Sequence, residues 1–259
     1  MPSKGEPRIP GARRWMQRLR GPRPGLEGMP LRSWRAVTAL GLLGLFVLLY
    51  VVPPFVLFIA QAAGVPAQEP RLSLAALVAS LAISVLLLGL MPIGYLRLVR
   101  PRERVWDLLQ LRVRRNTPVY VGIGGGAAVL LLLALALVLQ ALSAAGAYEP
   151  EESQLANDLI ALTRAYPILV LLVPLVAGVT EEIMFRGLLQ PRIGLGASAV
   201  LFGVTHAGYG TALQVVGPFV AGLAFGLLYR WRPTLWLPIS AHFFFDFLQL
   251  LASYASRAA

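Results

Sequence analysis

Three long stretches without a charged residue set the strongest limit on how this chain can fold. They are Val37–Ala60, Leu72–Leu96 and Val119–Tyr148. A helix of roughly 20 apolar residues crosses the hydrocarbon core of a bilayer. A helix that is apolar on every side has to be buried, either in a large core or in lipid. We therefore expect each stretch to form a transmembrane helix.

The later part of the chain is also apolar, but polar residues and glycines interrupt it more often. Its apolar stretches are Ala165–Thr180, Leu195–Tyr229 and Thr234–Ala255. Only 14% of the chain is charged and 57% is hydrophobic, whereas a soluble domain carries about 25% charged residues. We predict an all-α fold, a polytopic membrane helical bundle with about seven transmembrane helices.

The positions of the basic residues predict the orientation of these helices. Nine of the 23 basic residues fall within the first 35 residues, and seven more lie between Arg97 and Arg115. The connection before the fourth span is acidic instead, with Glu149, Glu151 and Glu152. Because cytoplasmic loops carry the excess of Lys and Arg, we expect a cytoplasmic N-terminus. Abundant Ala, Leu, Arg and Gly, with Lys4 as the one lysine, favour a prokaryotic plasma membrane.

Residues 1–35 are rich in Arg, Pro and Gly. We expect them to form a basic, disordered cytoplasmic arm that sets the topology and touches anionic lipids of the inner leaflet. Trp15 and Trp34 are candidate anchors there. RNA binding is the alternative for such a sequence, but we predict no nucleic-acid partner. The following apolar stretch is too long for a cleaved signal peptide.

Cysteine and histidine content excludes several kinds of chemistry. The chain has no cysteine and only two histidines. Disulfides, thiolate-bound metals and thiol catalysis are therefore excluded. A zinc site with three histidines is excluded as well. Any site chemistry has to come from carboxylates, the two imidazoles and arginines.

The first polar cluster inside an apolar stretch is Glu181-Glu182-Ile-Met-Phe-Arg186. On a helix, Glu182 and Arg186 are four residues apart and can form an ion pair. Glu181 points about 100° away and has no partner on its own helix. An unpaired carboxylate among apolar helices is a candidate general base. The alternative is a helix that ends at the cytoplasmic interface, with both glutamates in water.

The two histidines form the other clusters, Phe202-Gly-Val-Thr-His206 and His242-Phe-Phe-Phe-Asp246. Each pairs with a residue four positions away on one helical face. The alternative readings are a packed core histidine at 206 and a mutually satisfied His–Asp pair at 242. A carboxylate and two imidazoles that meet inside a bundle can activate water. They could also form a metal site with two histidines and a carboxylate.

These motifs, in this order, resemble those of the CPBP family, which contains the type II CAAX prenyl proteases and bacteriocin-processing (Abi) enzymes. The family pattern is EExxxR, then FxxxH, then HxxxN or HxxxD. The resemblance covers approximately Ala165–Leu251 and implies an all-helical intramembrane endopeptidase, a hydrolase. Site-2-type and aspartyl intramembrane proteases fit poorly, because the chain has no HExxH motif and no second intramembrane aspartate.

The resemblance also implies roles for individual residues. Glu181 would be the general base, polarising a water molecule together with His206. His242 and Asp246 would stabilise the oxyanion. The supporting residues would be Glu182, Arg186 and Phe202. Many relatives have Asn at the position of Asp246. An ionised Asp cannot donate a hydrogen bond, so Asp246 could instead orient a protonated His242 that acts as the donor.

The metal requirement stays open between two versions. In the favoured version no cofactor is required, because no HExxH helix is present. In the other, a divalent metal such as zinc is held by the four residues Glu181, His206, His242 and Asp246.

We accordingly expect a layout of residues 1–35 as the arm, 36–148 as three N-terminal transmembrane helices, and 149–256 as a CPBP-like catalytic helical domain. The expected partners are the lipid bilayer and a membrane protein or peptide substrate, lipidated or not. Two alternatives remain for the function: a proteolytically inactive scaffold that binds a partner, and a proton-coupled transporter. The absence of a recognisable inverted repeat argues against the transporter.

Overall fold

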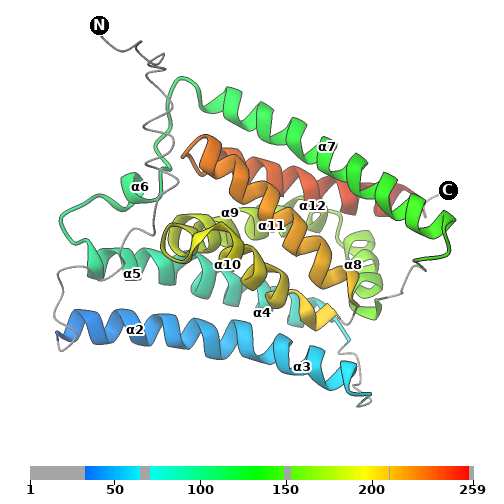
Figure 1. The fold of residues 1–259 in the computed structure, drawn as a ribbon, viewed down its shortest axis with the longest axis horizontal. Helices are drawn as coiled ribbons and strands as arrows, with labels where there is room; N and C mark the ends of the chain where they lie inside the picture. Colours follow the sequence, from blue (N-terminus) through cyan, green and yellow to red (C-terminus); the bar gives the residue numbers. More distant parts are fainter. Residues whose placement is uncertain (1–32, 65–70, 149–152, 210, 257–259) are drawn as a thin grey trace, which may run out of the picture.

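The computed structural model describes residues 33–64, 71–148, 153–209 and 211–256, and these residues form helices and connecting turns without a strand (Figure 1). The all-α fold class is therefore confirmed. Most of the predicted basic arm, residues 1–32, lies outside the described residues.

The N-terminal part begins with two long helices, each with a wide π-helical segment in its middle. The first runs through α2 (Trp34–Phe46), η1 (Val47–Val51) and α3 (Val52–Ala62). The second runs through α4 (Leu74–Ser84), η2 (Val85–Leu90) and α5 (Met91–Val99). Ser33 and Ser73 cap them, each accepting a hydrogen bond from a backbone N–H in the first turn.

Three further helices lead to the C-terminal part. The short α6 (Val105–Leu108) precedes α7 (Thr117–Ala144), the longest helix of the described chain. The acidic connection that follows is partly helical, because α8 (Gln154–Ala165) forms there with Ser153 as its cap. The sequence pattern indicated only a connection at this position. A single amphipathic helix of 12 residues is too short to be recognised as a span.

The C-terminal part begins with α9 (Leu169–Glu182), which continues through η3 (Ile183–Leu189) into α10 (Gln190–Thr205). A bend at Gly194, where φ is 85°, divides α10. The turn η4 (Ala207–Tyr209) follows, then α11 (Leu213–Trp231) and α12 (Trp236–Ser256). Figure 1 shows α10 and α11 enclosed between α7 and the α2–α3 helix.

Four helical stretches of the described chain are long and apolar enough to cross a membrane. They are Trp34–Ala60, Leu74–Val99, Thr117–Ala144 and Leu213–Trp231. The predicted number of seven spans is not confirmed. The α-helical part of α9 has 14 residues and α10 has 16, which is short for a span of about 20. Polar residues, including His242 and Asp246, interrupt α12.

Glycines allow the C-terminal helices to approach closely. A Cβ atom on Gly124 of α7 would come within 2.6 Å of the carbonyl oxygen of Leu237 on α12. A Cβ on Gly178 of α9 would come within 3.1 Å of the Phe243 nitrogen, also on α12. Small residues permit such backbone contact between membrane helices. These contacts fix α12 between α7 and α9.

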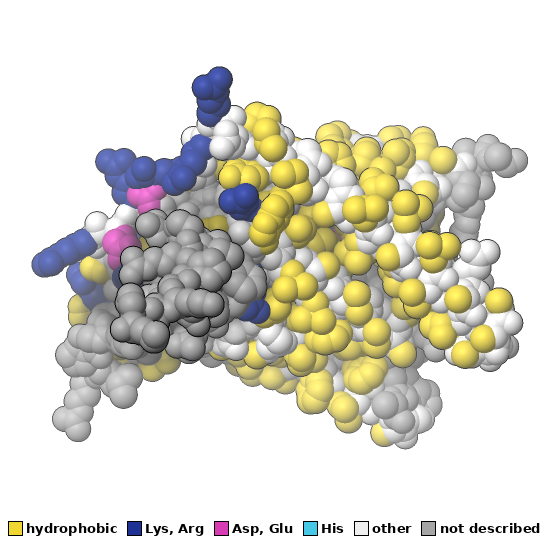
Figure 2. Space-filling view, turned by 45° about the horizontal axis from the view of Figure 1, so that its top comes forward, with side chains coloured by type: hydrophobic (Ala, Val, Ile, Leu, Met, Phe, Trp, Pro, Cys, Tyr) yellow, Lys and Arg dark blue, Asp and Glu magenta, His cyan; other side chains and the backbone are white. Residues whose placement is uncertain are grey.

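The outer surface is apolar along most of its length, as expected for contact with lipid. Exposed leucines occur on the N-terminal helices, among them Leu48, Leu130 and Leu137. Figure 2 shows hydrophobic side chains over most of the visible face and Arg side chains gathered at one end. A large exposed apolar surface on a folded protein marks a partner or a membrane.

Candidate active site

The three polar clusters singled out in the sequence meet inside the C-terminal bundle. Glu181 lies near the end of α9, His206 caps the C-terminal end of α10, and His242 lies in the first half of α12. The Glu181 Oε2 atom is 3.9 Å from His206 Nε2 and 4.0 Å from His242 Nε2. Asp246 Oδ2 is 3.3 Å from His242 Nε2. The structure thus brings all four residues together.

Glu181 has an unusual environment for a buried carboxylate. It is 8% exposed, and its Oε2 atom has no hydrogen-bond partner among the residues that the structure describes. Buried polar atoms are normally satisfied, and an unsatisfied charged group is costly. This oxygen therefore points at a position where a further polar group would be stabilised.

The hydrogen bonds of His206 fix the orientation of its ring. Its Nδ1 atom is 2.8 Å from the carbonyl oxygen of Phe202, one turn earlier. A carbonyl can only accept, so Nδ1 carries the hydrogen of this bond. In the neutral ring, Nε2 then holds a lone pair. This lone pair lies on the side of Glu181, and the predicted FxxxH spacing accounts for the geometry.

Glu182 and Arg186 form the ion pair that their spacing predicts. The Arg186 Nη1 atom is 2.7 Å from Glu182 Oε1, and both side chains are at most 1% exposed. The second guanidinium nitrogen donates to the carbonyl oxygen of Gly222 on α11 at 3.1 Å. Removing one partner of such a buried pair leaves an uncompensated charge. The pair therefore ties the end of α9 to the middle of α11.

His242 has a carboxylate at each of its ring nitrogens. Its Nδ1 atom is 2.9 Å from Glu182 Oε1, and its Nε2 atom faces Asp246 and Glu181. Both nitrogens can donate at once only in the doubly protonated ring. This arrangement favours a positively charged His242 held between carboxylates. It supports the version of the sequence hypothesis in which Asp246 orients His242.

Aromatic rings surround the polar groups and keep water from their inner side. The Phe202 ring lies 4.8 Å from His206 and 5.7 Å from His242, centroid to centroid. The Arg186 guanidinium lies 4.7 Å from the centre of the Phe202 ring, within reach of a cation–π interaction. Phe202 thus touches residues from all three clusters.

Phe225 is a site residue that the sequence analysis missed. Its ring stacks on His242 at 5.1 Å, and the Arg186 guanidinium is 5.6 Å from its centre. It lies on α11, which contributes no ionisable side chain to the site. Its only sequence signal is its position between Gly222 and Gly226, which mark a close helix approach. No motif identifies it.

The helix that carries the glutamates changes its geometry directly after them. Residues 183–189 form the π-helical segment η3, and all seven are buried. The spacing of Glu182 and Arg186 predicts a regular α-helix here. A π-helical turn is wider than an α-helical one and is frequent at functional sites. The wide turn follows Glu182 and contains Arg186.

Burial decides between two readings of the glutamates. Glu181, Glu182 and Arg186 are all buried, so the alternative of a wet helix end is wrong. Exposure increases toward the outside, from 5% for the His242 side chain to 22% for His206 and 31% for Asp246. Water can therefore reach the group from the His206 and Asp246 side.

The arrangement does not form a metal site as it stands. No group of three or more His, Asp or Glu in the described part of the chain has the spacing to hold a metal ion. Both nitrogens of His242 face carboxylates, and its Nδ1 atom is bonded to Glu182. A doubly protonated His242 offers no lone pair to a metal, whereas a neutral His242 that donates from Nδ1 to Glu182 would offer its Nε2 atom, so the protonation state of His242 decides whether the four-residue ligand set can bind one.

Fold and site together define a polytopic helical membrane protein with a buried carboxylate and two imidazoles at one point. Residues 163–248 match the family model of the type II CAAX prenyl endopeptidase Rce1-like proteins. The predicted resemblance is therefore confirmed over this segment, which contains all the residues of the site described above. The N-terminal helices lie outside it.

Comparison with individual proteins gives a relative in Bacillus subtilis (strain 168), a protein described as uncharacterized protein YpbD. It is 35% identical over 92 residues, which are 35% of this chain and 48% of the relative. The chain thus aligns with about half the length of this relative. No solved structure matches the chain.

Proposed function

We propose that this protein is an intramembrane endopeptidase that hydrolyses a peptide bond with a water molecule activated by Glu181 and His206. One observation carries the proposal. The Glu181 Oε2 atom, which has no hydrogen-bond partner among the described residues, lies within 4.0 Å of both histidine Nε2 atoms. The match of residues 163–248 to type II CAAX prenyl endopeptidases supports it.

The distance between Glu181 and His206 suits a bridging water. At 3.9 Å, Oε2 and Nε2 are too far apart for a direct hydrogen bond, for which about 2.7–3.2 Å is normal. Both are acceptors when Glu181 is ionised and His206 is neutral. One water molecule can donate a hydrogen to each of them. As its oxygen attacks the carbonyl carbon, its proton passes to Glu181.

The remaining steps of the reaction depend on His242 and Asp246. The carbonyl oxygen becomes an oxyanion when the C–O bond forms, and a protonated His242 stabilises that negative charge. Asp246 keeps the His242 ring oriented. The C–N bond then breaks, and Glu181 returns its proton to the leaving nitrogen. The products are a carboxylic acid and an amine, and the enzyme regains its starting state.

The substrate that fits this site is a membrane-associated protein or peptide, lipidated or not. The site is buried among helices whose outer surfaces are apolar, so a substrate has to enter from the membrane. A helical backbone uses its carbonyl groups in its own hydrogen bonds, so the cleaved segment would have to unwind locally. The family description supports a prenylated C-terminal peptide as the first substrate to test.

Replacement of Glu181 tests the mechanism directly. The purified protein in liposomes would be incubated with a fluorogenic farnesylated peptide and with a membrane peptide without a lipid. We expect Glu181→Gln and His206→Ala each to reduce cleavage at least about 100-fold, the contribution of a general base. Thermal unfolding of each variant would verify that the fold is intact.

Three results would contradict parts of the proposal. Cleavage by folded Glu181→Gln protein at the wild-type rate would exclude Glu181 as the base. Glu103→Gln, an exposed carboxylate paired with Arg100, is the matched control and should cleave normally. Loss of cleavage in EDTA that is restored by zinc would contradict the metal-free mechanism and support the metal-dependent one. Absence of cleavage of any membrane peptide by the wild type would favour the scaffold alternative.

A further inference from the structure

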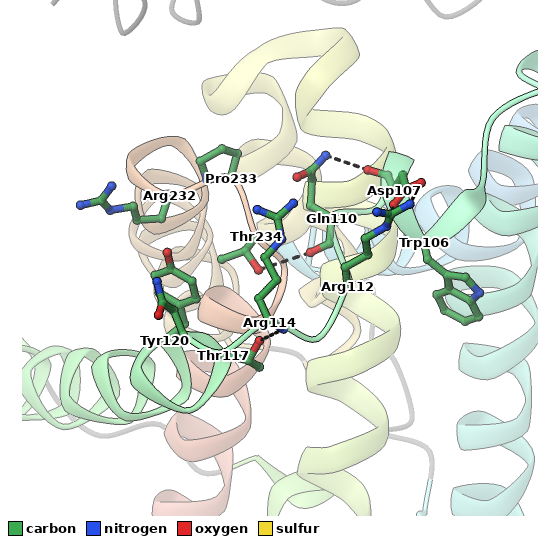
Figure 3. Close-up of a pocket in the computed structure, with 11 residues that line it drawn as sticks. Trp106, Asp107, Gln110, Arg112, Arg114, Thr117, Tyr120, Arg232, Pro233 and Thr234 are labelled. Carbon is green, nitrogen blue, oxygen red and sulfur yellow. Dashed lines mark hydrogen bonds and ion pairs between the residues drawn. The ribbon is translucent and has the colours of Figure 1, made fainter. Parts of the chain in front are cut away.

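A cavity of about 600 Å³ lies at the arginine-rich end of the molecule, outside the candidate active site (Figure 3). The chain between α6 and α7 forms one wall, and the connection between α11 and α12 forms the other. Its lining includes Trp106, Arg112, Arg114, Tyr120, Arg232 and Thr234. The cavity is large enough for a phospholipid headgroup.

The charge of the cavity is positive. Three arginines and one aspartate line it, and that aspartate, Asp107, is paired with Arg112. Figure 3 shows Arg114 extending between Gln110 and Thr234. Neither Arg114 nor Arg232 forms an ion pair with a described residue. Arg232 extends away from Arg114 in Figure 3, and its guanidinium lies 5.2 Å from the centre of the Trp231 ring. The Arg114 charge within the lining and the Arg232 charge at its edge therefore both lack a counter-charge among the described residues.

Neutral hydrogen-bond donors complete the lining. The hydroxyl group of Tyr120 and the amide of Asn116 are on the α7 side. The Thr234 hydroxyl lies on the other side and bonds the carbonyl oxygen of Gln110. Guanidinium groups with neutral donors beside them recognise phosphate oxygens well. The chemistry of the lining therefore suits a phosphate group.

Apolar residues beside the cavity indicate that the phosphate group belongs to a lipid and not to a soluble anion. Trp106 lines it and is 59% exposed. Val113 stands between Arg112 and Arg114 in the sequence, does not line the cavity itself, and is 77% exposed. A soluble anion would leave these side chains in water. The glycerol and acyl chains of a lipid would cover them. Tryptophan is enriched at the level of the headgroups, and basic pockets between membrane helices bind anionic headgroups.

We propose that this cavity binds the phosphate group of an anionic phospholipid such as phosphatidylglycerol. Arg114 and Arg232 neutralise the phosphate, Tyr120 and Asn116 donate to its oxygens, and Trp106 and Val113 contact the rest of the lipid. The site does not depend on the proposed peptidase activity.

Binding in this cavity should stabilise the fold, because its two walls are joined by hydrogen bonds. The carbonyl oxygen of Gln110 accepts from Leu235 N at 3.3 Å, and that of Leu111 accepts from Trp236 Nε1 at 3.2 Å. A lipid that contacts both walls adds to this connection. A ligand bound to the native state alone raises the unfolding temperature, so thermal unfolding reports binding.

The experiment uses the full chain, delipidated in a maltoside detergent. Phosphatidylglycerol, phosphatidylcholine and sodium phosphate are titrated separately, and the unfolding temperature is measured at each concentration. The test variant combines Arg114→Gln with Arg232→Gln. The control combines Arg104→Gln with Arg115→Gln, two exposed arginines of the same segment that do not line the cavity.

We expect phosphatidylglycerol to raise the unfolding temperature of the wild type and the control equally, at the same midpoint. The test variant should need at least about tenfold more lipid for the same shift, because two charged contacts are lost. If the test and control variants both need equally more lipid than the wild type, the lipid is attracted by surface charge in general and the cavity is not its binding site. If phosphatidylcholine raises the unfolding temperature as much as phosphatidylglycerol does, the cavity does not recognise the negative charge. If sodium phosphate raises it as much, the cavity binds free phosphate and not a lipid.

Discussion

Glu182 accepts hydrogen bonds from two buried side chains, Arg186 and His242, with a single oxygen atom. Its Oε1 atom is 2.7 Å from Arg186 Nη1 and 2.9 Å from His242 Nδ1. The residue therefore joins the cluster on α9 and η3 to the cluster on α12. Because all three side chains are nearly inaccessible to water, its charge cannot be replaced by solvent.

We predict that Glu182→Gln is strongly destabilising. The amide would leave Arg186 without its counter-charge in a buried position, which costs about 3–5 kcal/mol. Unfolding in mixed detergent and SDS micelles would measure the loss. Glu103→Gln, which breaks an exposed ion pair with Arg100, should change stability by at most about 1 kcal/mol. Equal effects of the two substitutions would contradict the structural role of Glu182.

Asp246 allows a sharper test of the role of His242. Asn at this position can still accept a hydrogen bond from His242 Nε2, whereas Ala cannot. We predict that Asp246→Asn keeps measurable peptide cleavage, within about tenfold of the wild type, and that Asp246→Ala loses most of it. A pH profile of kcat for each variant would separate orientation from charge. Greater activity of the Ala variant would contradict an orienting role.

The sequence allowed the ionisable residues of the site to be predicted, but not the apolar ones. Glu181, His206 and His242 stand out because charged or polar side chains are rare in apolar stretches. Phe225 does not, because a phenylalanine in a membrane helix is common. Its contact with His242 depends on how α11 packs against α12, which no local pattern specifies.

Gly178 links helix packing to the geometry of the site. It lies three residues before Glu181, where α9 crosses α12 next to Phe243. Any side chain here must push the two backbones apart. Because Glu181 and His242 belong to these two helices, their separation depends on this contact.

We predict that Gly178→Val reduces peptide cleavage at least about tenfold and lowers the unfolding temperature. The added side chain would meet backbone atoms, which cannot move without the helix, and misplacement of reacting groups by about 1 Å can cost up to 100-fold. Gly126→Val on α7 is the control, because a Cβ there meets nothing within 4 Å. Normal cleavage by the Gly178 variant would show that the site tolerates a shift of α9.

The elements themselves could be predicted only in part. The uncharged stretches predicted the long helices α7 and α11 well. The π-helical segment η3 (Ile183–Leu189) could not be predicted, because its apolar residues around Arg186 fit a regular α-helix equally well. Wide turns arise where tertiary contacts outweigh ideal hydrogen bonding, and the buried Arg186 on η3 makes such contacts with α11.

At the end of the molecule opposite the arginine-rich end, Asp158 connects α8 to the start of α4. Its Oδ2 atom accepts from the Leu72 backbone N–H at 2.8 Å, and Gln154 and Arg71 contact the other oxygen. These interactions favour the ionised carboxylate. They lower the pKa of Asp158 below its ordinary value of 3.8, with the Leu72 hydrogen bond as the main cause.

We predict a pH-dependent contribution of Asp158 to the stability of the whole chain. A lowered folded-state pKa gives stability that is present above the ordinary value of 3.8 and is lost as the pH falls through the lower folded value. The difference in unfolding temperature between wild type and Asp158→Asn should therefore be largest at pH 7 and shrink as the pH falls below 3.8. The other carboxylates titrate in the same way in both proteins, so they do not contribute to this difference in unfolding temperature. A constant difference would contradict the prediction.

On the scale of the molecule, charge patterning predicted a basic end, and a group of the described arginines gathers at one end (Figure 2). The number of spans was harder to predict. Helices that are shielded by other helices need not be apolar all round, so hydropathy alone identifies the outer helices best. The helices α9, α10 and α12, which carry the site, are the ones that hydropathy leaves uncertain.

The contact of Gly124 with α12 reaches beyond the segment that matches the family. Residues 163–248 supply the site, yet α12 rests on a helix from outside that segment, with backbone close to backbone. Grafting this segment onto the N-terminal helices of another protein would succeed only if the donor helix offered a glycine opposite Ser240. Recombination between relatives should therefore exchange α7 and α12 as one unit.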